Sequence, residues 1–197
     1  MAKEGQQSRL ESITQAVRAS GAGLPPVHLW NPPDCGDIDM RIAVDGTWYY
    51  NKTPITRPAM VQLFASIMRR EGDKYYLVTP VEKCGIAVDD APFLAVEVMP
   101  ETTAAGPALR FRLNVGDDVV CGPDHRLRFE RQPAHGGLKP YLHVRRDLWA
   151  CVTRPVYYEL ADLGEERVID SVPWYGVVSE GEFFAMAPVS ELEDHGA

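Results

Sequence analysis

The feature that most constrains the fold is a strict alternation of charged and apolar residues in one short stretch. Residues 37–42 read Asp-Ile-Asp-Met-Arg-Ile, with every second residue charged. Because successive side chains of a β-strand point to opposite faces, this period of two predicts a strand with a charged face and an apolar face. Asp45-Gly46 follows as a strong turn signal, and residues 47–50 resume in β-favouring residues. We therefore expect a β-hairpin.

The clearest helical pattern lies in residues 53–72. Thr56 can cap the first turn, and Pro58 stands where its missing N–H costs little. Apolar residues then recur on one face at helical spacing, and Gly72 fits just past the end. We expect a helix over this range, with Arg69 and Arg70 at its C-terminal end, where the helix dipole favours positive charge.

Short β-favouring runs account for most of the remaining chain, up to a hairpin that turns at Glu180-Gly181. Residues 100–108 are small and turn-rich, so they are the best candidate boundary between two sets of strands. Residues 155–163 fit either a strand or a short helix that begins at Pro155. The expected fold class is α+β, with two β-rich half-domains that each contain a helix.

Four parts of the chain follow from these signals. They are an N-terminal helix in residues 1–22, a first half-domain in 23–103, a second in 104–190 and an acidic tail in 191–197. The N-terminal helix has a capping box at its start and glycines at its end. It either docks on the body or serves as an interaction element. Docking is favoured because so short a helix is marginal alone.

A faint internal repeat relates the two half-domains. Residues 76–78 read Tyr-Leu-Val and residues 141–144 read Tyr-Leu-His-Val, and each run is followed by a charged bend and a second apolar run. Upstream, the turn at residues 45–48 has a loose counterpart at residues 116–119. The pattern indicates a duplication, although alternating strands also resemble one another by chance. If the duplication is real, the seam between the halves is the natural ligand cleft.

The composition argues against several classes of partner. With 20 basic and 28 acidic residues the formal net charge is −8, so a broad surface for nucleic-acid phosphates is not expected. No apolar run reaches the length of a membrane span, and the N-terminus lacks a signal-peptide core. The four cysteines form no CxxC pair, which favours reduced thiols in a cytoplasmic protein over a zinc site. Nothing here indicates the oligomeric state.

The charged face of residues 37–42 is the first candidate site. Asp37 and Asp39 lie about 6.6 Å apart along a strand, a separation at which two carboxylates can share a metal ion or flank a reacting water. The plain alternative is a solvated strand face on which Arg41 neutralises Asp39. The functional interpretation needs partial cover, which Trp48 and its aromatic neighbours on the next strand could supply.

Two further clusters could bind an anion. Residues 79–83 form a Pro-bent loop after a strand, and its Lys83 could meet an anionic ligand, whereas Glu82 and Lys83 could equally be a weak surface pair. His143, Arg145 and Arg146 are cationic and follow Tyr141, so they could hold a phosphate or carboxylate, or they could line a solvated strand face.

Motifs of familiar enzymes are absent. The chain has no GxSxG elbow, Walker loop, GxGxxG or HExxH, and its five histidines show no metal-ligand spacing. This favours a protein that is not an enzyme, although an unfamiliar enzyme stays open.

Several specific stretches of this chain resemble one known family. In the first half they are residues 35–42, 45–48 and 75–83, and in the second half they include residues 154–158 and 176–179. Together they resemble the proteobacterial family named Domain of Unknown Function 1285. The resemblance covers roughly residues 22–188, and its first half is the more specific.

This resemblance implies an architecture more than an activity. The family is similar to a duplication of β-rich halves, each with a helix, and its second half superficially resembles pleckstrin-homology-like folds. It has no established activity. Its implied ligand site is the interface between the halves, and a role in signal transduction is suggested for it. Its motif residues carry over to this chain as Asp37, Asp39, Arg41, Trp48, Thr79, Glu82, Lys83, Tyr141 and Arg145.

Two functions of different classes follow. The first is a non-catalytic module that binds a small polar or anionic ligand, or a protein partner, between the two halves. The second is a metal-assisted hydrolase or lyase in which Asp37, Asp39 and Glu82 supply the hard oxygen ligands that Mg²⁺ or Mn²⁺ prefers. The first is favoured, and it requires no cofactor.

Overall fold

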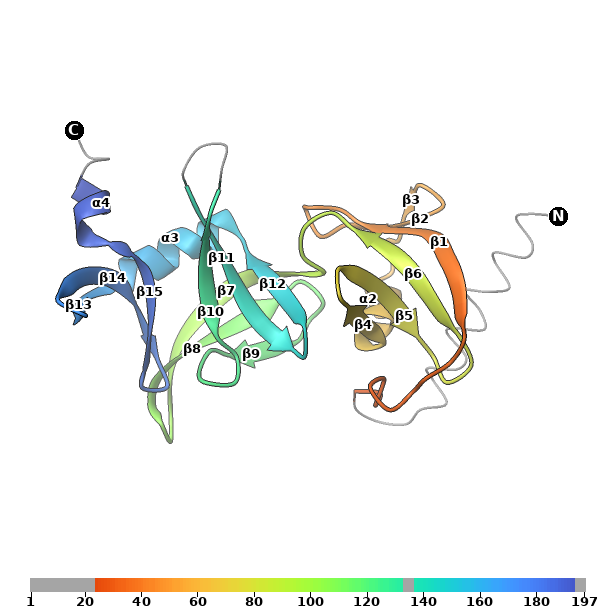
Figure 1. Cartoon of the computed structure of the whole chain (residues 1–197), viewed down its shortest axis with the longest axis horizontal. Helices are drawn as coiled ribbons and strands as arrows, with labels where there is room; N and C mark the ends of the chain where they lie inside the picture. The colour runs from red at the N-terminus through yellow and green to blue at the C-terminus, as the bar shows by residue number, and fades with distance from the viewer. Residues whose placement is uncertain (1–23, 133–136, 194–197) are drawn as a thin grey trace. The chain divides into compact units, whose positions relative to one another are not determined.

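The chain consists of two compact units, Met1–Pro92 and Phe93–Ala197, each with its own six-stranded sheet (Figure 1). The computed structural model describes residues 24–132 and 137–193. The expected N-terminal helix in residues 1–22 lies outside the described residues, as do residues 194–197 of the expected acidic tail. Across the described residues the protein is rich in β-structure and has few helices.

The sheet of the first unit has the strand order β3-β2-β1-β6-β5-β4. β1 and β6 are parallel, and every other neighbouring pair is antiparallel. The expected hairpin is confirmed, because β1 pairs with β2 across the turn at Gly46, whose φ is +80°. The strands are β1 Asp34–Ile42, β2 Trp48–Tyr50, β3 Thr53–Pro54, β4 Met68–Glu71, β5 Lys74–Val78 and β6 Lys83–Val88.

The helix of this unit, α2, is shorter than expected. It covers Pro58–Ser66, and its N-cap is Arg57, which makes no side-chain capping bond. The residues expected in its last turn instead form strand β4, paired with β5 across a two-residue turn that begins at Gly72. Gly72 has a φ of +59°, which suits the first position of a type II′ hairpin turn as well as a helix end. Gly72 therefore does follow the end of an element, as expected, but that element is strand β4 and not a helix.

One face of the first sheet is its core. Met40 and Ile42 of β1 are buried, as the period of two predicts. Trp48 lies opposite Ile42 in β2 and stacks on Phe64 of α2, with ring centroids 6.3 Å apart. α2 therefore covers this face. Asp37, on the opposite face, is exposed.

The second unit contains a sheet of order β10-β11-β12-β7-β8-β9 and a three-stranded sheet β13-β14-β15 (Figure 1). The open alternative for residues 155–163 is resolved as a helix, α3 Arg154–Asp162. The expected hairpin at Glu180-Gly181 is confirmed between β14 and β15. The elements are β7 Phe93–Thr103, β8 Gly106–Leu113, β9 Asp118–Val120, β10 Leu127–Arg131, β11 Leu138–Arg145, β12 Leu148–Val152, β13 Glu165–Ile169, β14 Val172–Ser179, β15 Glu182–Pro188 and α4 Val189–Glu193.

The two six-stranded sheets have the same topology. In each, three strands form an antiparallel meander, three more form a second meander, and the first and last strands pair in parallel at the centre. The expected similarity of the halves is thus confirmed, with β1–β6 equivalent to β7–β12. The helix is placed differently, since α2 precedes the fourth strand of its sheet and α3 follows the sixth.

One pairing within the expected repeat is wrong. Residues 45–48 join the first and second strands of their sheet, whereas residues 116–119 join the second and third of theirs. A short polar turn between antiparallel strands looks alike at either place, so local sequence does not separate them.

The boundary between the units also differs from the expected one. Residues 100–108, the expected boundary, form the end of β7, the start of β8 and the two-residue turn that joins them. A division between residues 103 and 104 would cut this hairpin at its tip, while the compact units meet between Pro92 and Phe93. Small residues mark tight hairpin turns as readily as linkers.

No disulfide joins the four cysteines, all of which lie among the described residues, and Cys35 is exposed while the others are buried. Burial raises the pKa of the Cys121 thiol to about 12. Among the described helices, none is both long and apolar enough to cross a membrane.

Candidate functional site

The face of the first sheet that α2 leaves uncovered carries two of the charged candidates, Asp37 and Lys83. Strand register places Asp37, Gly85, Tyr76 and Arg69 side by side in one row across β1, β6, β5 and β4. We call this surface the charged face, and define it by Asp37, Arg69, Glu71, Lys74, Tyr76 and Lys83.

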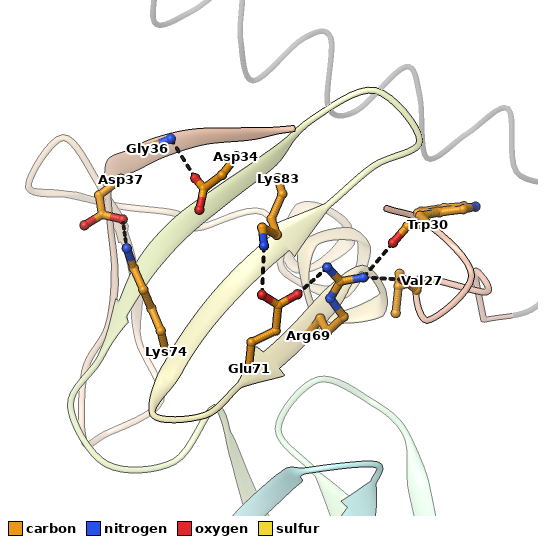
Figure 2. A network of polar contacts seen from close by, with 9 residues as sticks. All are labelled: Val27, Trp30, Asp34, Gly36, Asp37, Arg69, Glu71, Lys74 and Lys83. Atoms are coloured by element: carbon orange, nitrogen blue, oxygen red, sulfur yellow. Dashed lines mark hydrogen bonds and ion pairs between the residues drawn. The ribbon is translucent and has the colours of Figure 1, made fainter. Parts of the chain in front are cut away.

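A shared carboxylate joins two cations at the centre of the charged face. The Lys83 ammonium donates a hydrogen bond of 2.7 Å to Glu71 Oε2, and the Arg69 guanidinium donates to the other oxygen (Figure 2). The Lys83 side chain is 15% exposed and that of Arg69 14%, so both cations are largely withdrawn from water. The hydrogen bond from Lys83 lowers the pKa of Glu71, and the charge of Arg69 adds to the effect.

Arg69 is also held from its other side. Its Nη1 donates to the carbonyl oxygens of Val27 and Trp30, at 2.9 and 2.7 Å (Figure 2). Its Nε is buried and has no hydrogen-bond partner. Arg69 therefore ties the segment before β1 to the edge strand β4 and keeps one donor unsatisfied.

A second ion pair lies beside the first. Lys74 Nζ lies 2.5 Å from Asp37 Oδ1 (Figure 2). A Cβ added to Gly85 would lie 2.1 Å from the same oxygen, so the pair rests directly on the backbone of Gly85. Lys74 and Lys83 both lie over the ring of Tyr76, with Nζ 5.4 and 4.6 Å from its centroid. A buried tyrosine therefore supports two cations.

The expectation that Arg41 neutralises Asp39 on a solvated strand face is wrong about the partner of Arg41. Arg41 binds Asp89, not Asp39, through two hydrogen bonds, of which Nε to Oδ1 is 2.8 Å. This contact lowers the pKa of Asp89. Asp39 is exposed.

Three other candidates in this unit are parts of its framework. Trp48 is 1% exposed and belongs to the core face, so it does not cover the charged face. Its Nε1 is buried without a hydrogen-bond partner. Thr79 is buried, and its hydroxyl accepts from the N–H groups of Val81 and Glu82 in the turn between β5 and β6. Glu82 is half-buried in that turn.

The remaining candidates, Tyr141 and Arg145, lie in the second unit. The register of β11 shifts between His143 and Arg145, so that Arg145 pairs with Leu148 while His143 pairs with Trp149. Because a bulge moves the following side chain to the other face, Tyr141 and Arg145 do not share a face. Arg145 lies over the ring of Phe93 at 5.1 Å, and burial lowers the pKa of its guanidinium.

The structure gives the metal hypothesis no ligand cluster. In residues 24–132 and 137–193, no three His, Cys, Asp or Glu side chains gather in a way that could hold a metal ion. Asp37, Asp39 and Glu82 thus do not form such a group. The metal-assisted hydrolase or lyase stays a prediction that no contact here favours.

The charged face is a cluster of alternating charges. Its three cations, Arg69, Lys74 and Lys83, lie among the carboxylates of Asp37 and Glu71 and near a third carboxylate, Asp34, which lies opposite Lys83 in the strand register. The hydrogen bond to Asp37 raises the pKa of Lys74, and the charge of Asp34 adds to the effect. Sequence reasoning missed four of its residues, Arg69, Glu71, Lys74 and Tyr76. The signal was present, because Met-Arg-Arg-Glu at residues 68–71 and Lys-Tyr-Tyr-Leu at 74–77 flank a Gly-containing turn.

Two family models match adjoining parts of this chain. A model described as domain of unknown function (DUF1285), N-terminal domain, matches residues 25–91, and one described as protein of unknown function (DUF1285), C-terminal domain, matches residues 92–186. No curated protein shows a match.

Solved structures match as well. A DUF1285 family protein from Silicibacter pomeroyi DSS-3 is 52% identical, over 92% of this chain and 97% of its own, with a TM-score of 0.81. A DUF1285 family protein from Shewanella baltica OS155 is 27% identical, over 64% of this chain and 91% of its own, with a TM-score of 0.51.

Proposed function

This chain belongs to the DUF1285 family, and from that premise we propose that it is a non-catalytic module whose first unit binds a small anionic ligand on the charged face. The observation that carries the proposal is the sharing of Glu71 between Arg69 and Lys83. Within this triad two cations share one carboxylate, and the buried Nε of Arg69 has no hydrogen-bond partner, so an oxyanion of the ligand can accept further charge-assisted hydrogen bonds here.

The surroundings of the two lysines support the same proposal. Lys83 and Lys74 are already held over Tyr76 by ion pairs with Glu71 and Asp37. Binding to groups that are already ordered loses less side-chain entropy than binding to free lysines. The low exposure of Lys83 also reduces the screening of its charge by water. Gly85 leaves room for the ion pair between Asp37 and Lys74, since a side chain at that position would displace both residues.

The test is titration calorimetry of the full chain with inorganic phosphate and with citrate. We expect the wild-type protein to bind one of them with a millimolar or tighter dissociation constant. Lys83→Gln should weaken that binding about tenfold or more, because a hydrogen bond to a charged group contributes about 1.5–3 kcal/mol. Lys74→Gln should act in the same direction.

A matched control removes the same charge from the other side of the sheet. Arg70 follows Arg69 in β4 and its guanidinium lies over Tyr75, 5.4 Å from the ring centroid, on the core side. Arg70→Gln should leave the dissociation constant unchanged. Equal weakening by Lys83→Gln and Arg70→Gln would attribute the effect to net charge alone, and failure of wild type to bind either probe would contradict the proposal. Melting temperatures of all variants report whether each is folded.

We also propose three finer properties of this chain. The likeness of the second unit to pleckstrin-homology-like folds is supported by its strand-rich body with one nine-residue helix, α3, after the sixth strand of its main sheet. A role in signal transduction is supported by the family resemblance. A cytoplasmic location is supported by four cysteines that form no disulfide.

A further inference from the structure

The second unit repeats the central residues of the charged face at the same register. In the first sheet Arg69 lies opposite Tyr76 and Glu71 lies opposite Lys74. In the second sheet, Arg128 of β10 lies opposite Tyr141 of β11, and Glu130 lies opposite Lys139. The strands are topologically equivalent, since β4 and β5 correspond to β10 and β11. The same four residue types, Arg, Tyr, Glu and Lys, therefore occur in the same arrangement in both sheets.

The contacts around the second tyrosine resemble those around the first. Tyr141 is 7% exposed and Tyr76 is 8% exposed. The Arg128 guanidinium lies 5.3 Å from the Tyr141 centroid, and the Lys139 ammonium lies 5.6 Å from it. Arg128 and Glu130 form an ion pair at 3.0 Å.

Two substitutions between the units change the chemistry that each site suits. The position of Lys83 in the first sheet is held by Trp149 in the second, since Lys83 lies opposite Val78 and Trp149 opposite His143. The position of Asp37, which binds Lys74, is held by Leu94, which lies opposite Cys151. A cation and a carboxylate are thus replaced by an aromatic ring and an apolar side chain.

Trp149 makes the second site suitable for a planar group. The Arg128 guanidinium lies 4.1 Å from the Trp149 ring centroid, a closer stack than it makes on Tyr141. His143 meets the same indole ring edge-on at a centroid distance of 5.1 Å. Trp149 is half-buried and Arg128 is exposed, so a ligand can reach both side chains. A guanidinium held on an indole can pair with an oxyanion in its own plane while the ring system beside it stacks.

We propose that the second unit holds its own binding site, formed by Arg128, Lys139, Tyr141 and Trp149, for an aromatic ligand that carries an oxyanion. This site is separate from the one proposed on the charged face, and it does not depend on it. The oxyanion is a phosphate or a carboxylate attached to the ring. Arg128 and Lys139 bind the charge, and Trp149 selects for the ring.

The test uses phenyl phosphate and benzoate as aromatic probes, with inorganic phosphate and acetate as their ring-free counterparts. Calorimetry on the full chain should show that at least one aromatic probe binds about tenfold or more tightly than its counterpart, since stacking on an aromatic side chain contributes roughly 1–3 kcal/mol. The stronger of the two aromatic probes identifies the oxyanion. Arg128→Gln should weaken both aromatic probes about tenfold. Trp149→Leu should remove the preference for the ring and keep the weaker binding of the anion.

Control variants separate this site from general effects and from the first site. Arg131 lies on the same strand, three residues on and on the opposite face, where it binds Glu191. Because the charged face is itself proposed to bind phosphate, every comparison is made in the Lys83→Gln background, where the preference for the aromatic probes should persist. In that background Arg131→Gln should leave the binding of the aromatic probes unchanged. Lys139→Gln serves as a second test if Arg128→Gln melts at a markedly lower temperature. The proposal is overturned if the Lys83→Gln protein binds aromatic and ring-free probes alike, or if Arg128→Gln and Lys139→Gln bind as tightly as Arg131→Gln.

Discussion

Glu71 shows how a single side chain organises the charged face. It accepts hydrogen bonds from Arg69 and Lys83, which come from different strands, and its side chain is 39% exposed. Partial exposure means that solvent screens these contacts, so their contribution to stability is modest. Their main effect is positional, because Lys83 would otherwise be free to leave the ring of Tyr76.

The lowered pKa of Glu71 predicts a pH dependence with a definite sign. In the unfolded chain the carboxyl takes up a proton near its ordinary value of 4.5, and in the folded protein only at lower pH. The stability that it contributes is therefore complete above about pH 4.5 and is lost as pH falls through the folded-state pKa. The difference in free energy of unfolding between wild type and Glu71→Gln should shrink as pH falls from about 6 to about 3. Urea unfolding at each pH measures this difference, and a constant value would contradict the assignment.

At the scale of elements, the turns decide where candidate residues lie. The turn between β5 and β6 is held by Thr79, whose hydroxyl accepts from two backbone N–H groups and donates to the carbonyl of Glu82. This turn sets the start of β6 and hence the position of Lys83. Thr79 therefore acts on the charged face by positioning a strand.

Replacing Thr79 tests this structural role. Thr79→Val keeps the shape of the side chain and removes the hydroxyl, so we expect the free energy of unfolding to fall by about 1–3 kcal/mol. Thr79→Ser keeps the hydroxyl and should cost less than Thr79→Val. Urea denaturation of the two variants gives the comparison. Equal stability of the two would show that the hydroxyl bonds do not hold the turn.

At the scale of the whole molecule, the chain is two similar sheets with different surroundings. Each sheet has its own strands and its own buried residues, and none of the described strands pairs across the division at Pro92 and Phe93. The two similar halves carry tyrosines at equivalent positions, Tyr76 and Tyr141, and the side chains around these two rings differ.

This division predicts which fragments fold. Residues 1–92 and 93–197 should each fold alone, because each fragment keeps a complete six-stranded sheet. Residues 104–197 should not fold, because they lack the part of β7 that pairs with β12 at the centre of the second sheet. Chemical-shift dispersion in NMR spectra and cooperative thermal melting distinguish the two cases. Cooperative melting of 104–197 would contradict the boundary between Pro92 and Phe93.

The sequence by itself determined the features that depend on neighbours along the chain. The alternation of residues 37–42 predicted β1 and its two faces, Asp45-Gly46 predicted the hairpin, and the Tyr-Leu pairs predicted the duplication. Each rests on a period of two or on turn chemistry, which act over a few residues.

Only the tertiary structure decided which strands lie side by side and which charges meet. Arg41 reaches Asp89, which is 48 residues away, and Trp48 turns to the core because its strand pairs with Ile42. Arg69, expected at the end of a helix, lies in strand β4 because β4 pairs with β5. Long-range pairing overrides local propensity whenever it buries more apolar surface, and no local pattern records it. The charged face and its counterpart in the second unit exist only through such pairings.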